Sequence, residues 1–252
     1  NLEIVAVLGV GCDHIDVDAA AKRSVAITNT PDVNTEEVAD TAMGMLLGTV
    51  RQLPQADRFL RAGKWPTQMF PLTGTLRSKR LGILGLGRIG KAVARRAEAF
   101  GLEILYHGRN RQPEVSYTYF DSAVDLATAA DILMVIVPGG EATRNLVDTA
   151  MLRALGTEGV LLNVSRGTVV DEDALIAALN NKTILAAGLD AFVHEPYVSD
   201  ELIAMEHLVL LPHIGSGTHY TREMMSQAVF ENLRNWSEDL PVPNQVFPGQ
   251  QT

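Results

Sequence analysis

The apolar run at residues 80–84 leads directly into three glycines spaced as Gly-x-Gly-x-x-Gly, namely Gly85, Gly87 and Gly90. Where a strand turns into a helix, the first glycine permits the tight turn and the second lets the backbone approach a pyrophosphate. The third glycine lets the helix lie close to the strand. Three glycines alone are a weak signal, so the interpretation depends on the elements that flank them.

The residues after the glycines have the pattern of a helix. Apolar side chains recur at helical spacing at Ile89 and Val93, Gly101 can end the helix, and a second strand is expected at residues 103–107. The first N–H groups of this helix, around Arg88 and Ile89, and the helix dipole favour an anion. Strand, turn, helix and second strand together predict a dinucleotide-binding unit.

The same alternation of β-branched runs and amphipathic helices recurs along much of the chain. Strands separated by helices are typical of a parallel sheet that is covered on both faces. The predicted fold class is therefore α/β, with a doubly wound parallel sheet of the Rossmann type. The expected strands lie at residues 4–8, 25–27, 80–84, 103–107, 132–137, 160–163, 186–189 and 208–211.

The 252 residues leave room for one large domain or two modest ones. We predict a dinucleotide-binding domain at residues 33–216. Residues 1–32 and 217–252 are expected to form a second, smaller, flavodoxin-like substrate domain, with a helix at residues 221–236. Because residues 1–32 hold only about two strands and a short helix, too little for a core, we expect this domain to be incomplete at its N-terminus.

A long helix is expected at residues 35–62, because Asn34 can cap its start with Glu37 three residues on, and Gly63 can end it. Its apolar residues cover more than one face. Two interpretations stay open: the helix packs against a second subunit as well as its own core, or it is buried within one chain. The apolar residues are Val38, Met45, Leu46, Val50, Leu53, Phe59 and Leu60.

The charge balance excludes one class of partner. With 21 Lys and Arg against 30 Asp and Glu, the net charge is −9, and a chain without a basic surface is not expected to bind nucleic acid. Cys12 is the single cysteine, so we expect no intrachain disulfide, no metal site and a reducing, cytoplasmic location. No apolar run reaches the about 18 residues of a membrane span, so no membrane partner is expected.

The end of the second strand decides between two dinucleotides. An acidic residue about 20 positions past the glycines binds the ribose 2′-hydroxyl of NAD. Here Gly108, Arg109 and Arg111 occupy that place, and arginines can bind a 2′-phosphate through charge-assisted hydrogen bonds. NADP(H) is therefore the preferred cofactor and NAD(H) the second choice. The alternative interpretation is two solvated arginines in a polar loop.

Three chemically active side chains each follow a predicted strand: Arg166, Glu195 and His213. Ligands of open α/β sheets bind beyond the carboxyl ends of the strands. Reduction of a 2-oxo acid needs a proton donor near neutral pH, for which His213 is suited, and a cation for the substrate carboxylate, for which Arg166 is suited. Glu195 beside His213 would favour the imidazolium form and orient the ring. Among six histidines, His194 is the alternative choice.

Several separated motifs stand in the order found in one enzyme family. In these motifs the sequence resembles the D-isomer-specific 2-hydroxyacid dehydrogenases, most of all the NADPH-dependent glyoxylate/hydroxypyruvate reductases. The resemblance spans essentially the whole chain. The motifs are Gly-Val-Gly-Cys-Asp-His-Ile-Asp at residues 9–16, Gly-Leu-Gly-Arg-Ile-Gly at 85–90, Ser-Arg-Gly at 165–167, Glu-Pro at 195–196 and Pro-His-Ile-Gly-Ser at 212–216.

The resemblance implies an enzyme that reduces a small 2-oxo acid, such as glyoxylate or hydroxypyruvate, to the D-2-hydroxy acid. Arg166, Glu195 and His213 would be its catalytic residues, with His213 as acid and base. Backbone N–H groups around Val10 and Gly11 would hold the substrate carboxylate, together with Arg166 and His213. The alternative function is a non-catalytic relative that binds a dinucleotide and regulates a partner.

The resemblance also implies a cofactor site and a homodimer. Residues 35–62 would belong to the cofactor domain and build most of the dimer interface, and Asp190 would lie by the nicotinamide carboxamide. The loop at residues 137–143 keeps the family's proline but has glycines where larger residues are usual. The implied cofactor contacts are Gly85, Gly87, Arg88, Ile89, Gly90, Gly108, Arg109, Arg111, Val137, Pro138, Thr143, Val164, Ser165, Asp190, His213 and Gly215.

Overall fold

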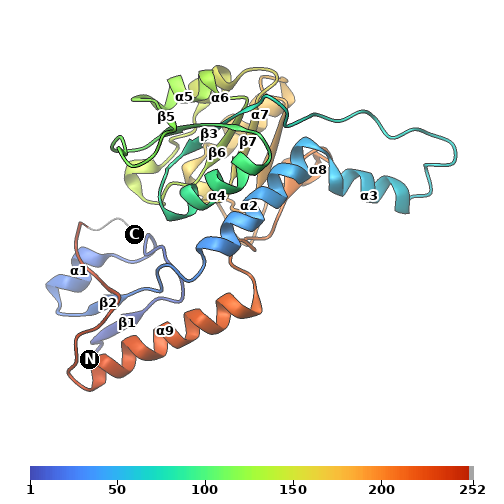
Figure 1. Cartoon of the computed structure of the whole chain (residues 1–252). Coiled ribbons are helices and arrows are strands. Elements are labelled where there is room, and N and C mark those ends of the chain that lie inside the picture. Colours follow the sequence, from blue (N-terminus) through green and yellow to red (C-terminus); the bar gives the residue numbers. More distant parts are fainter. Residues whose placement is uncertain (250–252) are drawn as a thin grey trace.

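A computed structural model describes residues 1–249 and contains two sheets, one of seven strands and one of three (Figure 1). The larger sheet has the order β5-β4-β3-β6-β7-β8-β9, and every neighbouring pair is parallel. This confirms the predicted α/β class. Its strands are β3 (Arg80–Leu84), β4 (Glu103–His107), β5 (Thr118–Tyr119), β6 (Ile132–Val135), β7 (Val160–Asn163), β8 (Ala186–Leu189) and β9 (Val209–Leu210).

The strand order reverses between β3 and β6. From β3 the chain runs outward to β4 and β5, and it then returns to the other side of β3 as β6. In a doubly wound sheet, this reversal opens a crevice at the carboxyl ends of the two strands, where ligands bind. The glycine motif directly follows β3, so the fold places it beside that crevice.

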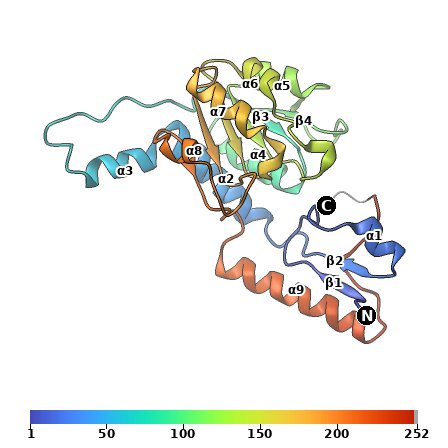
Figure 2. The same cartoon turned by 180° about the vertical axis from the view of Figure 1, so that it is seen from behind.

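Helices cover both faces of the larger sheet (Figures 1 and 2). Leu133 of β6 and Leu161 of β7 belong to the core on the face of α5 (Ala123–Ala129), α6 (Thr149–Leu155) and α7 (Glu172–Asn180). The next residue along each strand, Met134 and Leu162, belongs to the core on the face of α2 (Thr35–Val50) and α4 (Arg88–Ala99). Because successive side chains point to opposite faces and both faces are buried, these strands read as continuous apolar runs.

The prediction of a single helix at residues 35–62 is wrong. The chain forms α2 (Thr35–Val50) and α3 (Leu53–Arg61), with Gln52 between them in a left-handed conformation at a φ of 51°. Pro54 explains the break, since a proline ring collides with the carbonyl four residues earlier, here that of Val50. That carbonyl instead accepts a hydrogen bond of 3.1 Å from Gly74 N–H.

α2 begins where the sequence predicted, but the predicted capping hydrogen bond is not formed. Asn34 is the N-cap residue, yet its side chain makes no capping hydrogen bond. Eight residues of α2 are buried, including Met45 and Leu46, whereas no residue of α3 is buried. Of the two open interpretations, burial within one chain therefore describes α2 and not α3.

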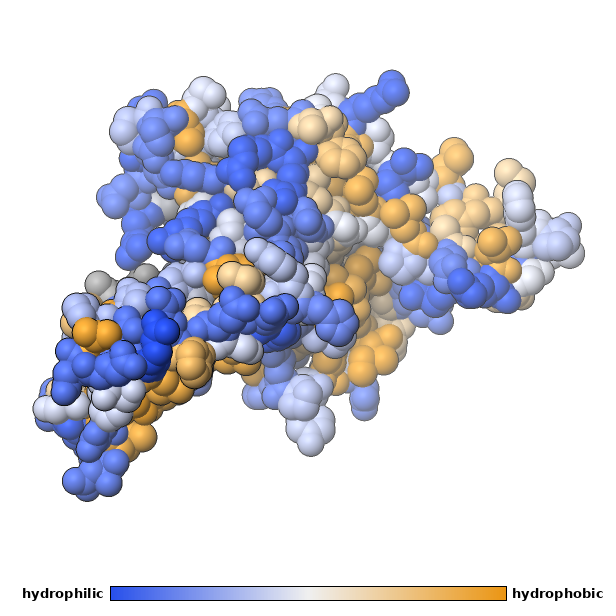
Figure 3. Space-filling view, turned by 60° about the horizontal axis from the view of Figure 1, so that its bottom comes forward, coloured by the Kyte–Doolittle hydropathy of each residue, from blue (hydrophilic) through white to orange (hydrophobic). Residues whose placement is uncertain are grey.

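The segment formed by α3 and residues 62–75 extends away from both sheets, and we call it the arm (Figures 1 and 2). It returns to the larger sheet at β3. Figure 3 shows apolar side chains along the arm, at the right of the view. Two of the apolar residues of the arm, Leu60 and Trp65, are 56% and 64% exposed.

The smaller sheet joins the two ends of the chain. Strands β1 (Ile4–Ala6) and β2 (Ala26–Thr28) are parallel, and β10 (Gln245–Val246) pairs antiparallel with β2. Helices α1 (Val17–Lys22) and α9 (His219–Ser237) belong to the same region. The sequence predicted a proline-rich tail where β10 lies. A strand of two residues is too short to show an alternating apolar and polar pattern, so it was missed. The predicted domain end at residue 252 lies outside the described residues.

Short helices complete the described structure: η1 (Glu141–Thr143), η2 (Gly167–Val169) and α8 (Asp200–Ala204). The strand β5 was not expected, since it too has only two residues. Among the helices within residues 1–249, none has both the length and the apolar character needed to cross a membrane.

Candidate active site

The candidate site residues lie at one edge of the larger sheet because its strands are all parallel. Arg166 follows β7, Asp190 follows β8 and His213 follows β9. The glycine motif follows β3 and the loop at residues 137–143 follows β6. Five loops thus meet at the carboxyl edge, where open α/β sheets bind ligands.

The structure brings Glu195 and His213 together. Nδ1 of His213 lies 2.8 Å from Oε2 of Glu195, and the two side chains are 44% and 35% exposed. The second carboxylate oxygen of Glu195 accepts a 2.9 Å hydrogen bond from Phe192 N–H, so the backbone holds the carboxylate. When Nδ1–H donates to Glu195, Nε2 is the ring atom that can exchange a proton with a ligand.

His213 is also held in a sparsely populated backbone conformation. Its φ is 52°, in the left-handed region that residues other than glycine rarely adopt. Such conformations persist where surrounding contacts impose them, and they cluster at functional sites. The constraining contact here is the buried Asp190, whose two oxygens accept 2.8 Å hydrogen bonds from the N–H groups of Ile214 and Gly215.

The carboxyl of Asp190 has an unusual environment. It is 3% exposed, and burial raises its pKa above the ordinary 3.8. The two backbone hydrogen bonds and the nearby His213 oppose that rise, while Glu195 adds to it. Gly215 permits this close approach, since a Cβ there would lie 3.0 Å from Oδ2 of Asp190. Asp190 therefore ties the end of β8 to the turn that carries His213.

Arg166 makes its own set of contacts. Its Nη1 donates to Ser165 O at 3.0 Å, and its Nε donates to Oδ1 of Asp13 at 3.2 Å. Asn163, at the end of β7, donates through Nδ2 to Arg166 O at 3.0 Å. Among the hydrogen bonds of residues 1–249, none joins Arg166 to Glu195 or His213.

Asp13 is a site residue that the sequence did not single out. The motif Gly-Val-Gly-Cys-Asp, which contains Asp13, was a signal that could have found it. Nothing in that motif, however, indicates a contact with Arg166, which lies 153 positions away. The structure therefore forms two clusters at this edge. One contains Glu195 and His213, and the other contains Arg166 and Asp13.

Buried asparagines hold the segment at Val10 and Gly11. Asn29 donates through Nδ2 to Val10 O at 2.8 Å, and Asn29 O accepts from Nδ2 of Asn232 on α9 at 3.1 Å. Asn244 in turn donates to Oδ1 of Asn232 at 3.2 Å. Asn29 and Asn232 are 4% and 0% exposed, so a buried hydrogen-bond network holds the segment at Val10 and Gly11 in place.

The geometry of the glycine motif fits a dinucleotide pyrophosphate. Gly85 has a φ of 102°, and a Cβ on it would meet Ile136 O at 2.6 Å. A Cβ on Gly90 would overlap Gly85 O, so this glycine lets α4 approach β3, whereas the space around Gly87 is open. The open side of Gly87, at the N-cap of α4, is where a phosphate can approach the backbone. Arg88 there pairs with Asp32 at 2.7 Å.

The loop after β4 lies beside the glycine motif. Gln112 donates through Nε2 to Leu86 O at 2.7 Å, and its backbone N–H donates to Oη of Tyr106 at 2.8 Å. Tyr119 of β5 donates through Oη to Gly108 O at 3.2 Å. These three side chains, which the sequence did not indicate, hold the loop that carries Arg109 and Arg111. The two arginines therefore belong to a loop that is anchored to the glycine motif.

The remaining predicted cofactor residues flank the crevice between β3 and β6. Val137 and Pro138 lie in the loop after β6, and Thr143 of η1 donates through Oγ1 to Pro138 O at 2.7 Å. Val164 and Ser165 come directly after β7, and Ser165 donates to Oδ1 of Asn163. Ile89 lies in the first turn of α4. The structure thus brings the predicted residues to adjacent strand ends.

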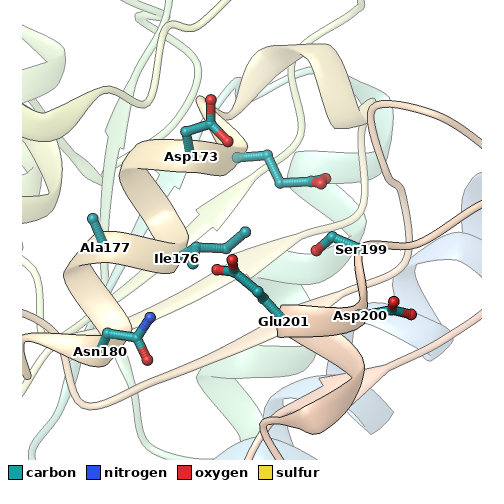
Figure 4. Close-up of a pocket in the computed structure, with 8 residues that line it drawn as sticks. Asp173, Ile176, Ala177, Asn180, Ser199, Asp200 and Glu201 are labelled. Atoms are coloured by element: carbon teal, nitrogen blue, oxygen red, sulfur yellow. The ribbon is translucent and has the colours of Figure 1, made fainter.

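A hollow of about 540 Å³ lies between α7 and α8 (Figure 4). Its lining includes none of the predicted site residues. Four carboxylates line it, and they would repel an anionic substrate such as a 2-oxo acid. These carboxylates are Glu172, Asp173, Asp200 and Glu201.

Known proteins share both the sequence and this architecture. Residues 43–215 match the family described as D-isomer specific 2-hydroxyacid dehydrogenase, NAD binding domain. A glyoxylate/hydroxypyruvate reductase A of Arabidopsis thaliana is 48% identical over 233 residues, which is 92% of this chain and 74% of that protein. A hydroxyphenylpyruvate reductase of Plectranthus scutellarioides is 45% identical over the same shares of the two chains.

A solved structure gives the same result in three dimensions. The NADPH-dependent glyoxylate/hydroxypyruvate reductase of Sinorhizobium meliloti, solved in complex with NADP and malonate, is 50% identical and superposes with a TM-score of 0.95. The match covers 97% of this chain and 77% of that chain. As the sequence motifs predicted, the chain belongs to the D-isomer-specific 2-hydroxyacid dehydrogenase family.

Proposed function

We propose that this protein uses NADPH to reduce a small 2-oxo acid, glyoxylate or hydroxypyruvate, to the D-2-hydroxy acid. The observation that carries the proposal is the 2.8 Å contact between His213 and Glu195 at the edge of the sheet that bears the glycine motif. A histidine oriented by a carboxylate is suited to proton transfer near neutral pH. Relatives with 48% and 50% identity are named as reductases of these two substrates.

Each side chain has one task in this reaction. Bound NADPH supplies the hydride to the carbonyl carbon. His213 gives its Nε2 proton to the carbonyl oxygen, which becomes the hydroxyl of the product. Glu195 accepts the Nδ1–H hydrogen bond and holds the ring in place. Arg166 binds the substrate carboxylate with the backbone N–H groups near Gly11, which orients the carbonyl.

The proposed cofactor site uses the glycine motif for the pyrophosphate and Arg109 with Arg111 for the 2′-phosphate. Its support is the anchoring of that loop to Leu86 through Gln112, and the NADP in the solved relative from Sinorhizobium meliloti. Asp190 would lie by the nicotinamide carboxamide. NAD(H) would bind more weakly, because it lacks the phosphate that the arginines contact.

A steady-state screen tests the function. Glyoxylate, hydroxypyruvate, pyruvate and phenylpyruvate are each offered with NADPH and with NADH, and 4-hydroxyphenylpyruvate is added because one relative is a hydroxyphenylpyruvate reductase. We expect the highest kcat/KM for glyoxylate or hydroxypyruvate with NADPH. Binding of NADPH without its oxidation by any of these acids would contradict the proposal and favour a non-catalytic regulatory protein.

We also propose a homodimer in which the arm packs on a second copy. Leu60, Trp65 and Met69 are 56%, 64% and 86% exposed, and an apolar surface of this kind is typical of an interface. Light scattering after gel filtration should give twice the chain mass of 27.3 kDa. Leu60→Asp should shift the protein toward the monomer, and Leu185→Asp, at a leucine outside the arm that is 53% exposed, should not.

The proposed domain division follows from the same arrangement. Residues 33–216 would bind the cofactor, and residues 1–32 with 217–252 would complete the substrate side of the cleft. Its support is that β10 pairs with β2 while the glycine motif follows β3 of the other sheet. A cytoplasmic location stays a prediction that rests on the single cysteine.

A further inference from the structure

We propose that Asp13 is a positioning residue that holds the Arg166 guanidinium so that its Nη2 meets the carboxylate of the 2-oxo acid, an inference that rests on the proposed function. Nothing in the local sequence assigns such a task to Asp13. Three observations carry it: the ion pair itself, the confinement of Arg166 by two glycines, and the atoms of the guanidinium that remain available.

The ion pair joins the two sheets across the candidate cleft. Oδ1 of Asp13 accepts from Nε of Arg166 at 3.2 Å, although 153 residues separate them. Asp13 belongs to the segment between β1 and α1, and Arg166 follows β7. The side chains are 25% and 34% exposed, so the pair is shielded better than most surface ion pairs of this protein.

Two glycines confine the same guanidinium. A Cβ on Gly139 would lie 2.7 Å from Cγ of Arg166 and 3.0 Å from Oδ2 of Asp13. A Cβ on Gly11 would overlap Nη2 of Arg166. The Arg166 and Asp13 side chains occupy the space that a larger residue would need.

The contacts leave both N–H groups of Nη2 on Arg166 for a ligand. Nε is bound to Asp13 and Nη1 to Ser165 O, while Nη2 makes no hydrogen bond with residues 1–249. Nη2 lies against Gly11, whose backbone N–H is proposed to bind the same carboxylate. The carboxylate would therefore meet one N–H of the arginine and one N–H of the backbone. A two-pronged contact through Nε would require Asp13 to release the guanidinium.

A competing effect of Asp13 has the opposite sign. Its negative charge repels the substrate carboxylate, so its removal could tighten binding. For two charges several ångströms apart in water this repulsion changes affinity by about threefold, and the 25% exposure of Asp13 leaves solvent to screen it. Loss of a charge-assisted hydrogen bond changes affinity by about tenfold or more. Positioning therefore outweighs repulsion, and removal of Asp13 is expected to weaken binding.

The test compares Asp13→Ala, Asp13→Asn, Arg166→Ala and the double variant. Oxalate, a two-carbon analogue of the substrate, is titrated into each protein saturated with NADP⁺, and KM for glyoxylate is measured in parallel. NADPH affinity, followed by fluorescence, reports an intact cofactor site. Asp18→Asn is the matched control, because it removes one exposed negative charge from α1 without touching Arg166.

We expect Asp13→Ala to raise both the oxalate Kd and the glyoxylate KM about tenfold, with NADPH affinity unchanged. Asp13→Asn, which keeps an acceptor oxygen for Nε, should recover most of that loss. The double variant should bind oxalate no more weakly than Arg166→Ala, since the task of Asp13 disappears with its partner. Asp18→Asn should behave as the native protein.

Equal or tighter oxalate binding by Asp13→Ala would overturn the proposal, and so would additive losses in the double variant. An equal loss in Asp13→Asn and Asp13→Ala would likewise overturn it, because charge and not the hydrogen bond would then be responsible. These readouts separate the two claims. A native protein that binds oxalate but oxidises no NADPH contradicts the proposed function. The positioning of Arg166 by Asp13 is then still tested by the oxalate Kd of the variants.

Discussion

Nδ1 of His213 lies 2.8 Å from Oε2 of Glu195, and the other oxygen of that carboxylate is bound by Phe192 N–H at 2.9 Å. The backbone thus fixes the carboxylate, and the carboxylate fixes the ring. Asp190 holds the backbone next to the same histidine, since it accepts hydrogen bonds from the two N–H groups that follow His213. The imidazole is therefore oriented before any ligand arrives, which is the arrangement that proton transfer requires.

Replacement of Glu195 tests this orientation. Glu195→Gln keeps the size of the side chain but replaces the carboxylate that lies 2.8 Å from Nδ1 of His213 with a neutral amide, so the ring is held less firmly. Turnover near neutral pH should fall by about tenfold or more. The measurement is kcat with saturating NADPH. Glu201→Gln, at an exposed position on α8, serves as the control, and an unchanged kcat in Glu195→Gln would remove Glu195 from the mechanism.

Replacement of His213 tests the proton donor. His213→Asn should lower kcat by about a hundredfold to ten-thousandfold, because proton transfer is lost. The NADPH Kd should change little, since the phosphate contacts lie on other loops. His207→Asn removes an exposed histidine just before β9 and should leave kcat unchanged. Retention of kcat by His213→Asn would show that another group supplies the proton, and His194 would be the first to examine.

Replacement of Arg109 tests the choice of dinucleotide. Arg109→Ala should raise KM for NADPH about tenfold or more, because charge-assisted hydrogen bonds to the 2′-phosphate are lost. KM for NADH, which has no such phosphate, should stay within about twofold of its native value. Arg153→Ala, an exposed arginine on α6, controls for the lost charge. Equal effects on the two cofactors would contradict the assignment.

Replacement of Asp131 tests the stability of the larger sheet. Burial disfavours the charged form of Asp131, but hydrogen bonds from Arg80 and the charge of Lys79 outweigh it, so the pKa lies below the ordinary 3.8. The stabilisation is therefore present above pH 3.8 and is lost as the pH falls through the lowered value.

Asp131→Asn should lower the free energy of unfolding at pH 7 by about 1–2 kcal/mol, since hydrogen bonds to a charged group are lost. Urea unfolding monitored by circular dichroism, from pH 7 down to pH 3, gives that difference as a function of pH. The gap between Asp131→Asn and the native protein should narrow in the acidic range. The control is Asp121→Asn at an exposed position, and a gap that is constant with pH would contradict the assigned cause.

Local patterns account for the parts of the fold that were predicted correctly. β3, β4, β7 and β8 have the predicted bounds, because each is a short apolar run buried on both faces and ended by a glycine or polar residue. The break between α2 and α3 was also encoded locally, in Pro54, but the apolar spacing across residues 35–62 concealed it. β5 and β10 have two residues each, and their partners in the sheet lie elsewhere in the chain.

The sequence by itself determined most of the strands and helices in their order, the glycine turn after β3, and the family to which the chain belongs. The elements and the turn follow from residue types at short spacings, because steric limits and burial act within one segment. The family follows from the resemblance of several separated motifs. The contact between Glu195 and His213 was expected from the sequence, and the structure contains it. Only the tertiary structure decided that Arg166 contacts Asp13 instead of either residue. The physical reason is distance along the chain: such contacts depend on how separate loops pack at one edge, and no local pattern specifies the position of a partner 153 residues away.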